Sequence, residues 1–112
     1  MKKIVSGAVF LLITFSYFSV QAVNFKVEKS TFVYKTINGV KLEMVMYQPE
    51  TALKQLPAIV FFFGGGWVNG DPSQFQHHAE YFASRGMVAF CADYRTRSKH
   101  GTTPFESVKD AR

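Results

Sequence analysis

Residues 58–67 read Ala-Ile-Val-Phe-Phe-Phe-Gly-Gly-Gly-Trp, an apolar run that ends in three glycines and a tryptophan. Six consecutive apolar residues predict a strand that is buried on both faces, and Pro57 marks its start. Glycine permits positive φ angles and a close approach of the backbone to a ligand. Open α/β sheets bind their ligands at the carboxyl ends of central strands, so the glycine stretch is the first candidate for a site.

The composition is that of a globular protein with one domain. Of the 112 residues, 47% are hydrophobic and 16% are aromatic, which is too apolar for a disordered chain. The net charge of +5 comes partly from the N-terminal lysines and is otherwise scattered, so we expect no nucleic-acid partner. Cys91 is the only cysteine in the sequence. An internal disulfide is therefore excluded, and its apolar surroundings predict a small core residue.

The first 22 residues have the pattern of a secretory signal peptide. Lys2 and Lys3 form a positive start, residues 4–20 are almost uncharged and apolar, and Val20-Gln21-Ala22 offers small residues for cleavage. We expect a mature domain over residues 23–112, a secreted or periplasmic location and no membrane association after cleavage. A transmembrane anchor is the alternative, and the serine, threonine and glycine residues within the stretch argue against it.

Two β-prone segments precede the apolar run. They cover residues 31–37 and 40–47 and are separated by Asn38-Gly39, the strongest short sequence signal for a hairpin. From Leu42 onward, apolar and polar residues alternate, which predicts one buried and one mostly exposed face. We therefore expect an antiparallel hairpin at the edge of the sheet.

A helix and a second buried strand follow the glycines. Asp71 is placed to cap the helix, Pro72 suits its first position, and Gln74 completes the spacing of a capping box. The helix should run over 72–85 and bury a stripe that includes Phe75, Phe82 and Ala83. Residues 87–92 are again nearly all apolar. The order strand, helix, strand predicts a parallel βαβ unit, with the strands 58–63 and 87–92 as neighbours.

The last stretch has a complete signal for the start of a helix. Residues 103–106, Thr-Pro-Phe-Glu, combine a cap, a proline at the first position and a glutamate at the third. Phe105, Val108 and Ala111 then begin an apolar stripe, but the sequence stops at Arg112 without a helix stop signal. We expect this chain to be the front part of a longer protein.

In their order, these elements resemble the amino-terminal part of the α/β-hydrolase esterases and lipases. The resemblance is carried by Phe63-Gly64-Gly65-Gly66-Trp67, Asn69-Gly70, Asp93-Tyr94-Arg95 and the helix that begins at Pro104. The closer similarity is to the hormone-sensitive-lipase-like and carbohydrate-esterase branch. It implies an α/β fold class: the amino-terminal portion of an α/β-hydrolase sheet, apparently truncated, with an antiparallel hairpin followed by a parallel βαβ unit.

The resemblance also implies a role for the glycines. In this family the triple-glycine loop follows the third strand and supplies backbone N–H groups to the oxyanion hole. Such donors stabilise the negative charge that develops on an attacked ester carbonyl. The resemblance thus implies that Gly64, Gly65 and Gly66 supply one or two donors and that Trp67 lies beside the acyl or alcohol pocket. A simpler interpretation stays open, in which the glycines only form a tight turn under Trp67.

Two departures from the family pattern concern catalysis. Phe63 stands where the motif usually begins with histidine, so any hydrogen bond made by that histidine is absent. No G-x-S-x-G nucleophile elbow occurs in the 112 residues, and the acid and base that follow the serine have no candidates. We expect no catalytic residue in this chain. The complete protein would be a serine hydrolase of short acyl or carbohydrate-linked esters, without metal or cofactor.

The other polar residues near these motifs have structural interpretations. His77 and His78 are adjacent on the predicted helix and point about 100° apart, so they do not form a metal site together. One of them should pack and the other should face solvent. Asp93 ends a predicted parallel strand, where it could bind the Arg95 or Arg97 side chain or hold the loop, and we expect a structural ion pair in preference to catalysis.

Two other functions compete with ester hydrolysis. A dinucleotide-binding module has the same order of glycine turn, helix, strand and terminal acid. The spacing argues against it, because position 69 is asparagine and the helix begins only near Pro72, away from the glycine turn. The second alternative is a non-catalytic, truncated exported remnant, which the absence of the nucleophile elbow leaves open.

Overall fold

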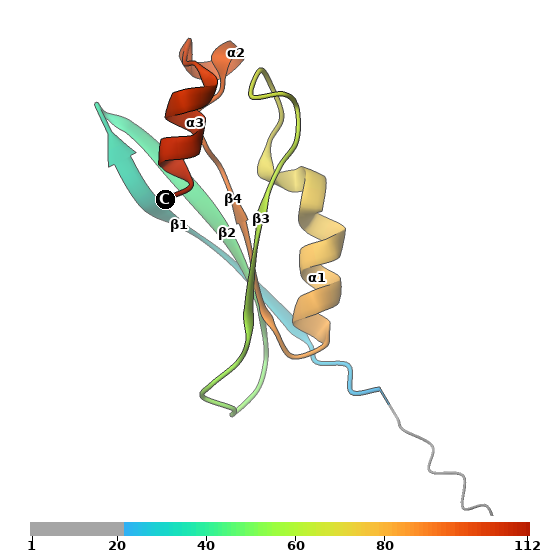
Figure 1. Ribbon diagram of the computed structural model, residues 1–112. Helices are drawn as coiled ribbons and strands as arrows, with labels where there is room; N and C mark the ends of the chain where they lie inside the picture. The colour runs from blue at the N-terminus through green and yellow to red at the C-terminus, as the bar shows by residue number, and fades with distance from the viewer. Residues whose placement is uncertain (1–21) are drawn as a thin grey trace, which may run out of the picture.

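The computed structural model describes residues 22–112 (Figure 1). The predicted signal peptide, residues 1–22, falls almost wholly outside this range and stays a prediction. The described part opens with an antiparallel hairpin of β1 (Val27–Ile37) and β2 (Val40–Pro49). Asn38 and Gly39 form its turn with φ angles of 48° and 79°. The predicted hairpin is confirmed and extends further at both ends than the sequence pattern indicated.

The second half of the sheet is the predicted parallel βαβ unit. Strands β3 (Ala58–Phe62) and β4 (Val88–Ala92) pair in parallel, and their connection contains the 3-10 turn η1 (Pro72–Phe75) and helix α1 (Gln76–Ser84). β4 also pairs antiparallel with β2, so the strand order is β1-β2-β4-β3. The sheet is therefore mixed, with β1 at one edge as predicted.

Helix α1 packs its apolar stripe against one face of the sheet. Ala79 and Ala83 are completely buried in a core that also contains Tyr47, Ala89 and Cys91. The partly buried aromatic residues Phe75 and Phe82 pack against this core, as the spacing predicted. Cys91 is confirmed as a small buried residue.

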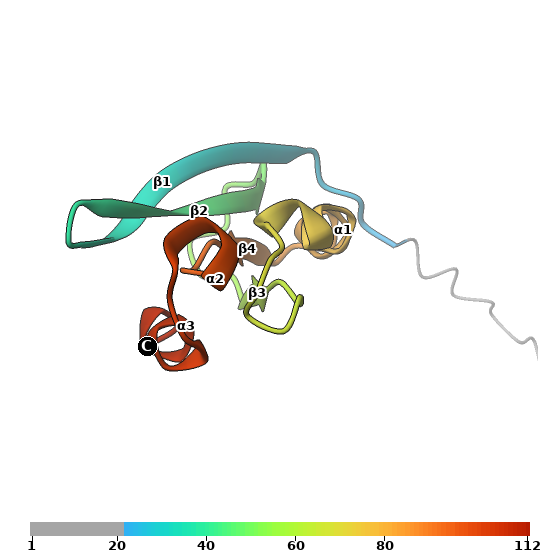
Figure 2. The same cartoon turned by 90° about the horizontal axis from the view of Figure 1, so that it is seen from above.

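Strand β3 differs from its prediction, because it is not buried on both faces. Phe61 stacks on Phe75 at 5.2 Å between ring centroids, whereas Val60 and Phe62 on the other face are 45% and 41% exposed. Within residues 22–112, β3 is the edge strand on the side of the sheet opposite β1. Helix α1 covers only the face of β3 that Phe61 occupies. In Figure 2, helix α3 lies on the opposite side of the sheet from α1. It approaches the uncovered face only near the end of β3.

Two short helices complete the described chain. Helix α2 (Arg97–His100) follows β4 after a short connection, and helix α3 (Pro104–Asp110) begins at the predicted residue. The Glu106 carboxylate accepts a hydrogen bond from the Thr103 backbone N–H at 2.8 Å, as in a capping box. Within residues 22–112, no helix is both long and apolar enough to cross a membrane.

The apolar stripe of α3 is not its packed face. Phe105 is 77% exposed and Val108 is about half exposed, whereas Ser107 and Asp110 are buried. Helix α3 is thus attached to the rest of the fold by hydrogen bonds and an ion pair. Hydrophobic periodicity alone does not report such polar contacts.

Candidate functional site

The glycine loop connects the end of β3 to η1 and has a tightly constrained backbone. The Val68 N–H donates to the Gly65 carbonyl at 3.1 Å, which closes a turn. Gly65 has a φ of 146°, and a Cβ atom at this position would lie 2.0 Å from the Asn69 carbonyl oxygen. Only glycine fits there. Trp67 also has a positive φ, 62°, which is uncommon for a residue with a side chain.

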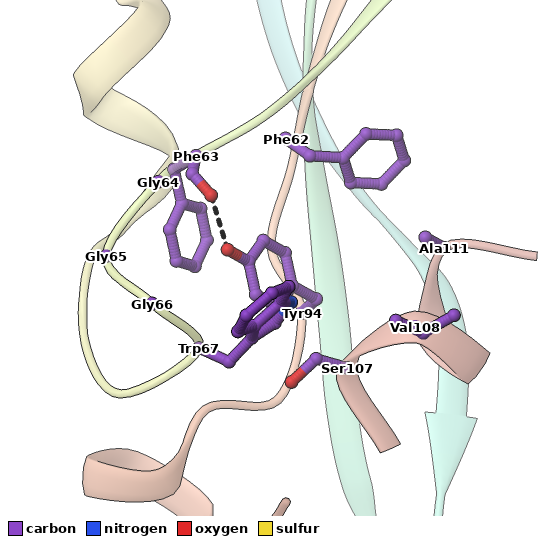
Figure 3. A pocket seen from close by; sticks show the side chains of 10 residues that line it. All are labelled: Phe62, Phe63, Gly64, Gly65, Gly66, Trp67, Tyr94, Ser107, Val108 and Ala111. Carbon is purple, nitrogen blue, oxygen red and sulfur yellow. Dashed lines mark hydrogen bonds between the residues drawn. The ribbon is translucent and has the colours of Figure 1, made fainter. Parts of the chain in front are cut away.

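The first residue of the loop is held from the side of β4. The ring of Phe63 stacks on the ring of Tyr94 with centroids 4.1 Å apart and planes within 11°, and both residues are buried. The Tyr94 hydroxyl donates a hydrogen bond to the Phe63 carbonyl oxygen (Figure 3). Burial, and to a smaller extent the Asp93 carboxylate, raises the pKa of Tyr94, which keeps the hydroxyl a donor.

The second residue of the loop is held from the side of η1. The Gly64 N–H donates to Gln74 Oε1 at 2.6 Å. Gln74 therefore does not complete the capping box predicted for it, and Asp71 caps the turn alone by accepting from the Ser73 N–H at 2.8 Å. Because the Gly64 amide is occupied, Gly65 and Gly66 are the two of the three glycines whose amides make no hydrogen bond within residues 22–112.

A cavity of about 300 Å³ opens beside this loop. Figure 3 shows the loop on one side, Phe62 at the end of β3 on another, and residues of α3 on a third. Trp67 is 48% exposed and is one of the lining residues. The lining consists of Phe62, Phe63, Gly64, Gly65, Gly66, Trp67, Tyr94, Ser107, Val108 and Ala111. The predicted loop and tryptophan thus share one mostly apolar pocket.

Helix α3 is positioned against this pocket by a buried ion pair. Arg95 Nη2 lies 2.8 Å from Asp110 Oδ1, and the Arg95 backbone N–H donates to Asp110 Oδ2 at 2.9 Å. Arg95 therefore pairs with Asp110, and the predicted ion pair between Asp93 and Arg95 is wrong. Within the described residues, Asp93 forms no ion pair with Arg97 either. Asp93 instead accepts a hydrogen bond from the Tyr94 backbone N–H at 3.1 Å.

The described residues do not contain an activated nucleophile. Ser107 lines the pocket, but its hydroxyl donates to the Arg95 carbonyl oxygen, and no serine of residues 22–112 is hydrogen-bonded to a histidine. His77 and His78 are both exposed, although the ring of His78 also lies near the ring of Phe75, so the prediction that one of the two is packed is wrong. Within the same residues, no group of three or more His, Cys, Asp or Glu side chains is placed to hold a metal ion.

The amide donors do not lie at the start of a helix. The first helical residue is Pro72, six positions after Gly66, and its turn is a short 3-10 segment capped by Asp71. A pyrophosphate in the glycine turn would therefore lack the helix N-terminus that dinucleotide-binding modules use. The structure agrees with the spacing argument against such a module.

No known family profile matches this sequence. No curated protein matches it closely enough to be informative. The solved structures do contain clear matches. One match is Est2, an esterase of the planctomycete Thermogutta terrifontis. The alignment covers 74% of the present chain at 46% identity, with a TM-score of 0.70.

This chain matches the amino-terminal part of an esterase. The apo form of Thermogutta esterase 2 gives 44% identity over 81% of this chain, with a TM-score of 0.67. The chain spans only about 30% of the length of Est2. The resemblance to esterases and the α/β fold class predicted from sequence are confirmed over this part.

Other structures of the same Thermogutta enzyme describe its ligands and its reactivity. Est2 has been determined with bound propionate and with bound butyrate. Esterase 2 has also been determined after phosphorylation by paraoxon, with 46% identity to this chain and a TM-score of 0.70.

Proposed function

We propose that this chain provides the oxyanion-binding part of a carboxylic-ester hydrolase. The observation that carries the proposal is the pair of unpaired amides, Gly65 and Gly66, at the rim of an apolar pocket beside the end of β3. The 46% identity to an esterase over 74% of the chain supports it independently. Of the three glycines that the resemblance implicated, Gly64 is assigned to holding the loop, because its N–H is occupied by Gln74.

The chemistry follows from where charge develops during ester hydrolysis. When a nucleophile attacks the ester carbonyl, its oxygen becomes an anion, and two preorganised N–H groups lower the energy of that state. One such donor is worth about 2.7–4 kcal/mol in the transition state. The tight turn closed by Gly65 and Val68 fixes the two amides before the substrate arrives, so no reorganisation is needed during the reaction.

The nucleophile in this proposal is a serine outside the described residues. Paraoxon phosphorylates Thermogutta esterase 2, and organophosphates of this kind react with activated nucleophiles such as the serine of a Ser-His-acid triad. Ser107 does not qualify, because its hydroxyl is bonded to a backbone carbonyl and has no base beside it. The 112-residue chain alone should therefore hydrolyse no ester.

The substrates in this proposal are esters with a short acyl group, on a small-molecule or carbohydrate alcohol. Propionate and butyrate are the carboxylates that hydrolysis of propionyl and butyryl esters would release, and both are bound in Thermogutta structures. The pocket beside the loop has an apolar lining that suits a short alkyl chain. We place Trp67 beside the acyl or alcohol group, since it lines the pocket next to the amide of Gly66.

The test is hydrolysis of p-nitrophenyl acetate, butyrate and dodecanoate by the complete gene product and by the 112-residue chain. We expect turnover by the complete protein with preference for the two shorter esters, and none by the chain alone. A Ser107→Ala variant of the complete protein is the matched control and should keep its turnover. Turnover by the chain alone, or none by the folded complete protein, would contradict the proposal.

We also propose that the protein is exported. The positive start and the apolar stretch of residues 4–20 support cleavage after Ala22. Mass spectrometry of protein isolated from the native host should find Val23 at the N-terminus, in a secreted or periplasmic fraction. An intact Met1 in the cytosol would contradict export.

A further inference from the structure

One peptide group of the glycine loop is hydrogen-bonded on both sides by side chains. The Phe63 carbonyl and the Gly64 N–H belong to the same peptide unit. The carbonyl accepts from the Tyr94 hydroxyl, and the N–H donates to Gln74 Oε1 at 2.6 Å. Tyr94 follows β4 and Gln74 belongs to η1, so the peptide is held between two separate elements. Figure 3 shows the bond from Tyr94.

We propose that Gln74 and Tyr94 are positioning residues for the oxyanion donors. This inference rests on the proposed function and extends it to two residues that do not carry the donor groups. A peptide held at both its carbonyl and its N–H has a fixed plane, and this plane sets the direction in which the chain continues to Gly65 and Gly66. Fixing the Phe63–Gly64 peptide therefore fixes one end of the segment that carries the two amides, and the turn closed by the Val68 N–H on the Gly65 carbonyl restrains the other end.

The surrounding contacts make this peptide the rigid base of the loop. The Phe63 ring is stacked on the Tyr94 ring, and Gly70 packs so closely that a Cβ there would lie 2.5 Å from the Phe63 ring and 2.7 Å from the Gly64 carbonyl oxygen. Beyond this base, the loop residues Gly65 and Gly66 carry no side chain that packs. Their orientation depends on the base and on the turn closed by the Val68 N–H.

Gln74 has a second effect, which is to occupy the Gly64 amide. Its side-chain oxygen is a neutral acceptor and adds no negative charge beside the place where the oxyanion forms. Without this acceptor the Gly64 N–H would be free and only the Tyr94 hydroxyl would hold the peptide, so the donors at Gly65 and Gly66 would be less well preorganised. Small displacements of such groups cost much of the rate, about 100-fold for 1 Å.

The variants Gln74→Met and Tyr94→Phe test the inference in the complete protein. Gln74→Met keeps the side-chain length and removes the amide, and Tyr94→Phe keeps the ring that stacks on Phe63 and removes the hydroxyl. Each should lower kcat for p-nitrophenyl butyrate about 10- to 100-fold with little change in KM, because the lost interaction acts in the transition state. Gln76→Met is the control, since the Gln76 side chain bonds to Glu80 on α1 and makes no hydrogen bond to the loop within residues 22–112.

The double variant tests whether the two side chains act on one peptide. If they do, the loss of kcat in Gln74→Met/Tyr94→Phe is smaller than the product of the two single losses. A purely structural role would lower the melting temperature and leave kcat per folded molecule unchanged. Wild-type kcat in either folded single variant, or strictly multiplicative losses, would overturn the inference.

A readout on the complete protein that does not depend on activity separates this inference from the proposed function. The Gly64 amide should exchange slowly with solvent in NMR experiments, and about 10-fold or more faster in Gln74→Met, while the Gly65 amide should exchange rapidly in both. Fast exchange of Gly64 in the wild type would overturn the inference. If the complete wild-type protein does not hydrolyse esters, the proposed function fails, whatever the exchange rates are.

Discussion

Arg95 and Asp110 form an ion pair whose carboxylate is completely buried, with 2.8 Å between Nη2 and Oδ1. The Arg95 backbone N–H bonds to the same carboxylate at 2.9 Å. This pair attaches α3 to the segment after β4. Because α3 carries Ser107 and Val108, with its C-cap residue Ala111, into the wall of the pocket, the pair also sets the shape of the candidate site.

Removing one partner of this pair should destabilise the protein strongly. In Asp110→Asn the Arg95 guanidinium stays mostly buried without its counter-charge, and such changes typically cost about 3–5 kcal/mol. That is a large share of the roughly 5–15 kcal/mol by which most domains are stable. Urea unfolding measures the difference. The control is Glu50→Gln, which breaks the exposed Lys26–Glu50 pair and should cost less than about 1 kcal/mol. Equal effects of the two variants would contradict this account.

The same pair predicts a loss of stability in acid. Burial disfavours the ionised form of Asp110, but hydrogen bonds from Arg95 outweigh burial and lower the pKa of Asp110. A lowered pKa in the folded state stabilises the fold at pH values above the unfolded pKa of about 3.9. This contribution disappears as the pH falls through the lower, folded pKa. The difference in unfolding free energy between wild type and Asp110→Asn should therefore shrink below about pH 4. A difference that grows in acid would have the wrong sign.

The thiol of Cys91 should be unreactive in the folded protein. Cys91 is 1% exposed, and burial raises its pKa, with a smaller opposing effect from Lys29. Both conditions disfavour the thiolate, which is the reactive form. We expect no reaction with Ellman's reagent in native buffer and complete reaction in denaturing urea. Rapid labelling of the folded protein would show that β4 is accessible and that the core is wrongly described.

Two neighbouring glycines should differ in their tolerance of alanine. A Cβ at Gly65 meets the Asn69 carbonyl oxygen at 2.0 Å, whereas a Cβ at Gly66 meets nothing within 4 Å. In the complete protein, Gly65→Ala should displace a donor and lower kcat about 10²–10³-fold. Gly66→Ala keeps its N–H and carries only the strain of a left-handed residue, about 1–2 kcal/mol, which mainly affects stability. Ester turnover and thermal melting measure both, and a larger loss of kcat in Gly66→Ala would contradict the assigned geometry.

The local pattern of the sequence predicts most of the fold. The Asn38-Gly39 turn and the cap at Asp71 each depend on residues near one another in the chain, and the structure contains both. The alternation after the turn does not give the buried face, because Val45 and Tyr47 pack against the core while Met44 and Met46 are only partly buried. The parallel pairing of β3 with β4 also follows from a βαβ unit, whereas the pairing of β2 with β4 was not predicted. The predicted features are the ones that short-range rules describe.

The contacts that shape the candidate site join residues far apart in sequence. Gln74 has the spacing of a capping box but accepts a hydrogen bond from the Gly64 N–H instead. Arg95 could pair with Asp93 or Asp110, and in the structure it pairs with Asp110. No periodicity or spacing distinguishes these partners. The exposure of one face of β3 was also not predictable. An apolar run predicts that a strand is buried, but it does not say whether other elements within residues 22–112 cover both of its faces.

The most direct test of the central claim is paraoxon labelling of the complete protein, with the modified residue identified by mass spectrometry. We predict one phosphorylated serine outside residues 22–112, with loss of p-nitrophenyl butyrate hydrolysis in proportion to labelling. The Gly65→Ala variant should be labelled much more slowly, because the phosphoryl oxygen occupies the same donors. Labelling of a residue within 22–112, or an active protein that paraoxon does not modify, would contradict the assignment of this chain to a serine ester hydrolase.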